Sequence, residues 1–251
     1  QVVFVGDPLQ AIYEWRGADK FSMQSLGELL GIEKSYLLPI SYRCPLSVTD
    51  FVQQNYCDDF QCVPTAIQGS ISTVFHVRDF LKGLKESRTS AVILSRKNMN
   101  AVRCYFAALK IGLPAVMRGR FKGLAEELIG IVEKICNGKD SITILQTKLA
   151  DYDLEISEKL ARKGEKGASK LDAHRDRLDV LETLLLEWSV NTVSEFIAEI
   201  RAFFSDDESE ARGKVILPSI HRFKGREHET VAILQDSFNK KDPVELHYVA
   251  A

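Results

Sequence analysis

A short polar segment near the beginning of the chain carries side chains that are suited to chemistry. The sequence VVFVGDPLQAIYEWRGA runs from Val2 to Ala18, and its apolar part stops at Gly6-Asp7-Pro8, as a buried parallel strand entering a loop does. Nucleotides bind at such loops in open α/β folds. Gln10 could bond a phosphate oxygen or orient an attacking water there, and Trp15 beside Arg16 suits stacking on an unpaired base and neutralising a phosphate. Alternatively, Trp15 is a core aromatic residue and Gln10 a turn residue.

A second polar pair lies where an apolar run meets a helical pattern. Arg96 and Asn98 follow the run Ala91 to Ser95 and open the helix expected from Asn98 to Ile111. The start of a helix is a favourable place for a phosphate, because backbone amides point at it. The equally simple alternative is an N-cap asparagine and a solvated arginine.

Short apolar runs alternate with helical patterns along most of the chain, which favours α/β layers around a parallel sheet. Gly112 and Pro114 follow the helix that begins at Asn98 and act as its stop signals. The expected strands are Gln1 to Val5, Ser35 to Leu38, Ile71 to Val77, Ala91 to Ser95, Ala115 to Met117, Lys214 to Leu217 and Val231 to Leu234.

From about Leu124 to Phe204 the pattern is helical only, which predicts an all-helical insertion. Thr192 to Glu195 has the form of a capping box that opens a helix, and the charged stretch Ala161 to Lys170 is interpreted as a mobile surface connector. A packing scaffold is the simplest role for this block, beside regulation, duplex contact and partner binding. Its two apolar stripes are Leu124, Leu128, Ile131, Val132 and Ile135, and Leu171, Leu178, Leu181, Leu185 and Trp188.

The composition is that of an ordinary globular protein. The chain has 251 residues, of which 45% are hydrophobic and 27% charged, and a formal net charge of −2. This balance excludes coating of nucleic acid by bulk charge but leaves room for a local basic groove. Five irregularly spaced cysteines favour reduced thiols over a disulfide framework or a metal centre. Without a membrane-spanning run or a leader pattern, the expected location is cytoplasmic, and the abrupt apolar ends indicate a fragment of a longer protein.

The segment GDPLQAIYEWRGA closely resembles motif III of the UvrD/Rep-type superfamily 1 DNA helicases, usually G-D-x-x-Q-S-I-Y-x-[FW]-R-G-A, with Ala11 in place of serine. In that family this motif joins the ATP site to the single-strand groove. The resemblance implies that Gln10 senses the γ-phosphate. It also implies that Tyr13, Trp15 and Arg16 contact single-stranded DNA.

Further segments follow in the order of that family. LPISYRCP, Leu38 to Pro45, looks like motif IV, usually L-x-x-N-Y-R-S, with Ser41 in place of asparagine. The resemblance implies that Tyr42 stacks on adenine and that Arg43 bonds the γ-phosphate, as an aromatic ring and a guanidinium fork can do. AVILSRKNMNAV resembles the element of the second core domain that touches the DNA backbone, through Arg96 and Asn98.

VILPSIHRFKGREHETVAIL, Val215 to Leu234, resembles motif V, roughly T-x-H-x-x-K-G-L-E-x-x-x-V, and Arg226 stands where leucine is usual. The implied contacts are Ser219, His221 and Lys224 to DNA, and Gly225 and Glu227 to the nucleotide. VELHYVAA, Val244 to Ala251, looks like the opening of motif VI, and the chain stops before the arginine finger of that motif.

The resemblance implies a RecA-like P-loop NTPase fold with a parallel sheet flanked by helices. The expected parts are residues 1–39 from the first core domain, 40–120 and 206–251 from the second, and 121–205 as the helical insertion. The implied partners are single-stranded DNA and its junctions with duplex, and the implied cofactors are ATP and Mg²⁺.

No G-x-x-x-x-G-K-[ST] sequence occurs, and no D-E pair suited to Mg²⁺ follows an apolar strand. The Mg²⁺ ligands are therefore expected outside this sequence, and the chain alone should not hydrolyse ATP. The expected function is part of an ATP-dependent 3′-to-5′ DNA helicase. Two alternatives stay open: a helicase subunit of a recombination nuclease complex, and a single-stranded DNA-binding remnant that has lost hydrolysis.

Overall fold

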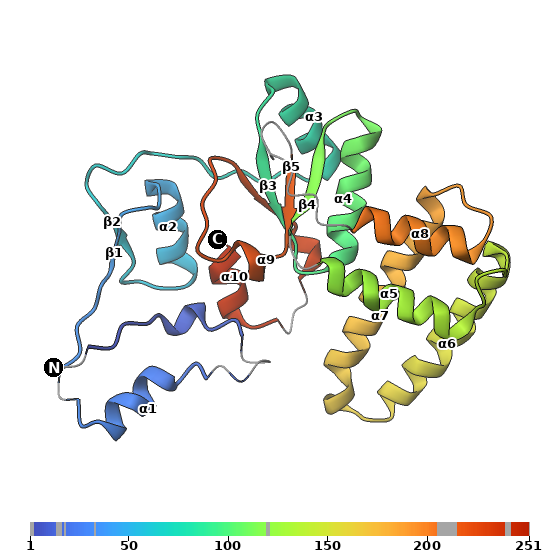
Figure 1. Cartoon of the computed structure of the whole chain (residues 1–251). Coiled ribbons are helices and arrows are strands. Elements are labelled where there is room, and N and C mark those ends of the chain that lie inside the picture. The colour runs from blue at the N-terminus through green and yellow to red at the C-terminus, as the bar shows by residue number, and fades with distance from the viewer. Residues whose placement is uncertain are drawn as a thin grey trace. The chain divides into compact units, whose positions relative to one another are not determined.

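A computed structural model describes residues 3–13, 17, 19–32, 34–118, 121–204, 215–238 and 242–250 (Figure 1). The chain divides into two compact units. The first comprises Gln1–Phe75 and Asn239–Ala251, and the second comprises His76–Phe238. Both contain parallel strands accompanied by helices, so the protein belongs to the α/β class, as the alternation of patterns predicts.

The second unit is built on a parallel four-stranded sheet in the order β4-β5-β3-β6. Its strands are β3 (Ala91–Leu94), β4 (Ala115–Arg118), β5 (Val215–Pro218) and β6 (Val231–Ile233). These positions confirm four of the expected strands. Every residue of β3 is buried, which explains why its sequence is an unbroken apolar run rather than an alternating one.

Two helices pack on this sheet, α3 (Val77–Ser87) and α4 (Asn98–Lys110). Helix α4 confirms the expected element, and Gly112, with φ +70°, supplies the left-handed conformation that lets the chain turn back into β4. One core cluster joins α3, α4, β3 and β5 through Leu81, Leu84, Ala91, Ile93, Cys104, Ala108, Val215 and Leu217.

The helical block is a four-helix assembly inserted between β4 and β5, as expected. It contains α5 (Phe121–Ile135), α6 (Ile142–Ala161), α7 (Glu165–Glu187) and α8 (Val193–Phe203). Its core includes most of the two predicted stripes and also Val102 of α4, so α4 packs against both the sheet and the block. The capping box is confirmed, since Thr192 and Glu195 bond each other's backbone amides.

The connector expected from Ala161 to Lys170 is wrong. Helix α6 continues to Ala161 and α7 begins at Glu165, so the turn between them is only three residues long. Gly164, with φ +57°, makes this short turn possible. The lysine, glutamate and alanine residues around it are good helix formers, which is why their charge did not signal a loop.

The remaining elements of the second unit lie between and after its last strands. The single-turn helix α9 (Ile220–Phe223) follows β5, and the short 3₁₀ helix η3 (Gln235–Ser237) follows β6. Both therefore belong to the edge of the sheet where the parallel strands end.

The first unit has short elements only. They are η1 (Pro8–Gln10), α1 (Ser22–Leu29), β1 (Ile40–Ser41), α2 (Leu46–Asn55), β2 (Gln61–Cys62) and α10 (Val244–Ala250). The two strands β1 and β2 pair in parallel, with Ile40 opposite Gln61.

Three expected strands do not form among the described residues. Val3 to Val5 and Ser35 to Leu38 are irregular, and Ile71 to His76 is irregular before α3 begins at Val77. Val3, Leu37 and Phe75 are 77%, 74% and 91% exposed. An apolar run forms a strand only where a neighbour completes its hydrogen bonds, and these runs have none in the described part of the chain.

Candidate functional site

Gln10 lies in a tight turn organised by Asp7. The carboxylate of Asp7 accepts a hydrogen bond from the backbone N–H of Leu9 at 2.9 Å and caps the short helix η1. Pro8 follows as the first helical residue, where its missing N–H costs nothing. The side-chain amide of Gln10 donates to Asp7 Oδ2 at 2.9 Å, so the sequence Asp-Pro-Leu-Gln fixes the orientation of the amide.

Helix α10 contributes a tyrosine to the same turn. The hydroxyl of Tyr248 donates to Asp7 Oδ2 at 3.3 Å, and its ring meets that of Tyr56 edge-on with centroids 6.0 Å apart. Burial, and after it the charge of Asp7, raises the pKa of Tyr248 above its ordinary value of 10.0. The segments that resemble motif III and the start of motif VI therefore share one hydrogen-bonded network.

Tyr42 and Arg43 stand on a turn made by the serine that precedes them. The hydroxyl of Ser41 accepts hydrogen bonds from the backbone N–H groups of Arg43 at 3.3 Å and Cys44 at 3.1 Å. An asparagine side chain makes the same kind of turn, so serine and asparagine can serve the same local purpose at position 41. Tyr42 is 85% exposed, and its ring faces solvent, where it can stack on a planar ligand.

In the second unit, the segments that contain Arg96 and Ser219 meet at the edge of the sheet where β3 and β5 end. Ser95 and Ser219 form a parallel bridge that extends the pairing of the two strands. The backbone N–H of Arg96 donates to the hydroxyl of Ser237, which follows β6, at 3.0 Å. The two resembling segments that contain Arg96 and Ser219 are thus brought together, although more than 100 residues separate them in the sequence.

Asn98 does not present an open helix start. Its backbone N–H and its side-chain amide donate to Asp176 Oδ2 at 3.1 and 2.9 Å, and Met99 N–H donates to Asp176 Oδ1 at 3.0 Å. A carboxylate of α7 therefore occupies the place where the sequence suggested a phosphate. Asn98 is thus engaged inside the protein, and its predicted contact with DNA stays a prediction.

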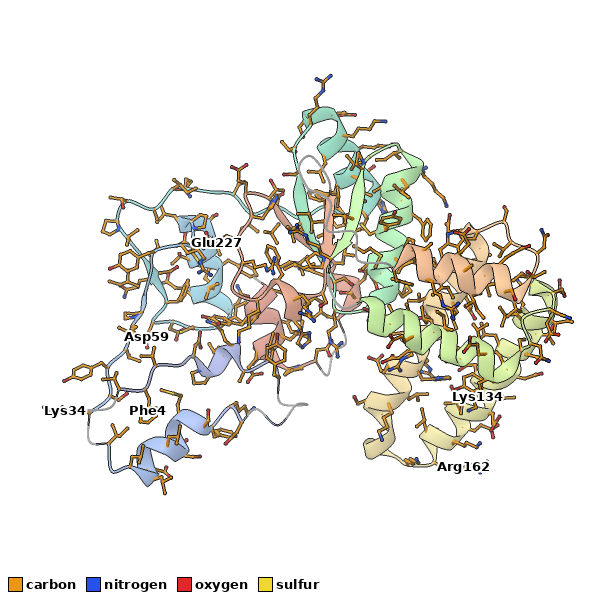
Figure 2. The ribbon with its side chains drawn as sticks, viewed as in Figure 1. Phe4, Lys34, Asp59, Lys134, Arg162 and Glu227 are labelled. Atoms are coloured by element: carbon orange, nitrogen blue, oxygen red, sulfur yellow. The ribbon has the colours of Figure 1, made fainter. Side chains whose placement is uncertain are left out.

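The segment after Ser219 separates its predicted residues between two places. His221 lies in α9, and Lys224 and Gly225 follow that helix directly; Gly225 has φ +77°, a conformation that favours glycine. Glu227 is exposed on the loop that leads to β6 (Figure 2). It precedes His228, whose ring lies 3.4 Å from the hydroxyl of Ser90 at the start of β3, so Glu227 is near the opposite edge of the sheet from Arg96.

Not every predicted residue can be located. Trp15 and Arg16 lie outside the described residues. Tyr13, at the end of the described segment before them, is half-buried. Gln10, Tyr42 and Arg43 belong to the first unit, whereas Arg96, Asn98, Ser219, His221, Lys224, Gly225 and Glu227 belong to the second.

Sequence reasoning missed Tyr248 and Asp176, although both bond residues that it selected. Tyr248 lies within the segment that resembles the opening of motif VI, but only the fold shows that its hydroxyl bonds Asp7. Asp176 has a weak signal in the sequence: with Asp172 it forms an acidic pair four residues apart, and such a pair lies on one helix face.

Two open hollows of the described residues lie in the helical block, and both are bordered by Tyr152. Neither is lined by a candidate site residue from the sequence analysis. In the described part of the chain, no group of three or more His, Cys, Asp or Glu side chains is arranged to hold a metal ion. No described helix is long and apolar enough to cross a membrane.

Comparison of the sequence with models of known protein families gives no match. A search of curated proteins also gives no match. Sequence motifs and geometry therefore carry the functional argument that follows.

Proposed function

We propose that this chain is part of an ATP-dependent DNA helicase of the UvrD/Rep type, with a RecA-like fold, and that it moves on single-stranded DNA. The proposal rests on one observation. Segments that resemble helicase motifs occur in the order of that family, and within each unit the fold joins segments that are distant in the sequence.

In the second unit the proposed DNA contact lies at the carboxyl edge of the sheet. Arg96 and Ser219 follow adjacent parallel strands there, where ligands of α/β folds usually bind. His221 and Lys224 follow closely after Ser219 and add polar and cationic groups to that region. Groups of this kind hold a nucleic-acid backbone without reading its sequence.

In the first unit the proposed nucleotide contact uses Gln10, Tyr42 and Arg43. The exposed ring of Tyr42 suits stacking on adenine, and the guanidinium of Arg43 suits a terminal phosphate. Bound ATP with Mg²⁺ would supply the phosphoryl transfer that drives movement. Gln10 would report the nucleotide state to Trp15 and Arg16. Within the second unit, Gly225 and Glu227 are the residues proposed to contact nucleotide.

Fluorescence anisotropy with a labelled oligothymidine tests this proposal. The chain should bind the single strand more tightly than a duplex of equal length, with an affinity that falls as salt rises. Trp15→Ala should weaken binding by about 1 to 3 kcal/mol, the usual value of one stacked base. Tyr36→Ala is the matched control, since Tyr36 is an exposed aromatic residue outside the resembling segments, and it should leave the affinity unchanged.

Binding that is equal for single strand and duplex, or insensitive to Trp15→Ala, would overturn the assignment of a single-strand groove. Equal losses for Trp15→Ala and Tyr36→Ala would indicate non-specific stacking rather than a site.

A single-stranded DNA-binding remnant is a second candidate, favoured by the lack of a G-x-x-x-x-G-K-[ST] sequence in these 251 residues. The two candidates differ in their response to nucleotide. A motor fragment should keep weak binding of a fluorescent ATP analogue that Arg43→Ala abolishes, whereas a remnant should show none.

A further inference from the structure

Helix α4 begins without a cap of its own. Its N-cap residue is Lys97, whose side chain makes no capping hydrogen bond. The first backbone amides of a helix need acceptors, because no carbonyl of the helix reaches them. Asp176 of α7 accepts from both Asn98 and Met99 and so performs this task from 78 residues away.

The contact between α4 and α7 extends along both helices. Lys97 Nζ lies 3.1 Å from Asp172 Oδ1 at the beginning, and Lys110 Nζ lies 2.6 Å from Glu187 Oε1 at the end. The residue numbers increase together, so the two helices run in the same direction. In both ion pairs, α4 with its N-cap residue contributes the lysine and α7 contributes the carboxylate.

Asp176 is the central member of this row. It is only 9% exposed, and it forms three hydrogen bonds with the turn that leads from β3 into α4. The same turn carries Arg96, whose backbone N–H is held from the other side by Ser237. The turn is thus fixed between the helical block and the end of β6.

We propose that Asp176 is a positioning residue that fixes the β3–α4 turn and thereby orients Arg96 toward bound nucleic acid. This inference rests on the proposed function, because it assigns the helical block a role in the same DNA contact. The carboxylate of Asp176 accepts from two backbone N–H groups and from the side-chain amide of Asn98. It resists rotation of the turn, because any rotation breaks a charge-assisted hydrogen bond that is largely shielded from water.

A double-mutant cycle tests the proposal, with the affinity for oligothymidine as its readout. Asp176→Ala should weaken binding about 3- to 10-fold, which is the effect expected if most of the free energy of the lost cap has to be recovered when the turn is ordered by DNA. If Asp176 acts through the turn, Arg96→Ala should cost clearly less in the Asp176→Ala background than in the unchanged protein. Asp176→Asn, which keeps one acceptor in place, should restore part of the affinity and of the coupling.

Glu187→Gln is the matched control, because it removes the ion pair at the other end of the same two helices. It should leave the affinity and the effect of Arg96→Ala unchanged. Additive losses in the Asp176 cycle, or equal effects of Glu187→Gln, would reduce Asp176 to a general structural role. Tighter binding by Asp176→Ala would mean that the carboxylate competes with DNA, which also overturns the proposal.

Amide hydrogen exchange without DNA separates this inference from the proposed function. Asp176→Ala should accelerate exchange at Asn98 and Met99, and Glu187→Gln should not. If the unchanged protein binds no single-stranded DNA, the proposed function fails, and the inference fails with it as a statement about nucleic acid. Local acceleration would then still establish Asp176 as the residue that fixes the turn, whereas unchanged or unit-wide exchange would overturn that as well.

Discussion

At the scale of single residues, several candidate site residues are held by a neighbour that the fold supplies. Ser41 shapes the turn before Tyr42 and Arg43. Asp7 orients the amide of Gln10 and accepts from Tyr248. A polar side chain that is fixed by a second one loses little freedom when it binds a ligand, and such pairs are therefore typical of preorganised sites.

Tyr248 makes a prediction about pH. Its pKa is raised by burial, so the folded protein keeps the phenol proton at a pH where the unfolded chain releases it. The contribution of Tyr248 to stability is therefore constant well below pH 10 and is lost as pH rises above the ordinary tyrosine pKa of 10.0. Tyr248→Phe should cost up to about 1 kcal/mol at neutral pH and should reduce the alkaline loss, as measured by urea unfolding at a series of pH values.

Tyr36→Phe serves as the comparison for Tyr248→Phe, because the Tyr36 side chain is 80% exposed. Its unfolding should follow that of the unchanged protein at every pH. Alkaline profiles that are identical for Tyr248→Phe and the unchanged protein would show that burial of this phenol does not govern the loss.

At the scale of elements, the start of a helix can be predicted from its own sequence only where the capping side chain is close to it in that sequence. The start of α8 can be predicted from its own sequence, because Thr192 and Glu195 each bond the other's backbone N–H. The start of α4 is stabilised by a residue of α7 instead. Between α6 and α7, a single glycine with positive φ replaces the long connector that the charges suggested.

The capping box provides a test at this scale. Thr192→Ala removes the hydroxyl that accepts from the N–H of Glu195, and it should destabilise the second unit by about 1 kcal/mol. Thr192→Ser keeps that acceptor and should cost less. Thermal unfolding followed by circular dichroism measures both, and a Thr192→Ala variant as stable as the unchanged protein would show that the cap contributes little to α8.

At the scale of the whole molecule, the two units differ in how much apolar surface they bury. Both core clusters of the described residues lie in the second unit. The described part of the first unit buries few large apolar side chains, among them Ile12, Val52 and Leu246. Because burial of apolar surface is the main stabilising term, the first unit has less to offset its loss of conformational entropy. Its exposed apolar residues include Val3, Val5, Leu29, Tyr36, Leu37, Leu38, Ile67 and Phe75.

This difference predicts unequal protection from hydrogen exchange. Amides of α2 and α10 in the first unit should exchange faster than those of β3, α4 and α7 in the second. Exchange followed by mass spectrometry at neutral pH measures both sets in one sample. Equal protection would contradict the inference that the first unit is the less stable of the two.

The sequence by itself determined several elements of the second unit, namely the four strands β3 to β6, helix α4 and the start of α8. Val215 to Leu217 reads as a strand because its own apolar residues must be buried, and Asn98 to Lys110 reads as a helix because its stop signals are local. Where an apolar run needed a neighbouring strand, as at Val3 to Val5, the same reasoning failed. The pattern of apolar residues shows which side chains of a segment can be buried, but it does not show which other segment will pack or pair with it.

The sequence also predicted candidate site residues, from Gln10 in the Asp-Pro-Leu-Gln turn to the pair Tyr42-Arg43. Only the tertiary structure decided that Tyr248 bonds Asp7, that Ser95 pairs with Ser219, and that Asp176 caps α4. These contacts join residues separated by 78 to 241 positions. A hydrogen bond between such residues depends on how whole elements pack, and no local pattern of side chains encodes that packing.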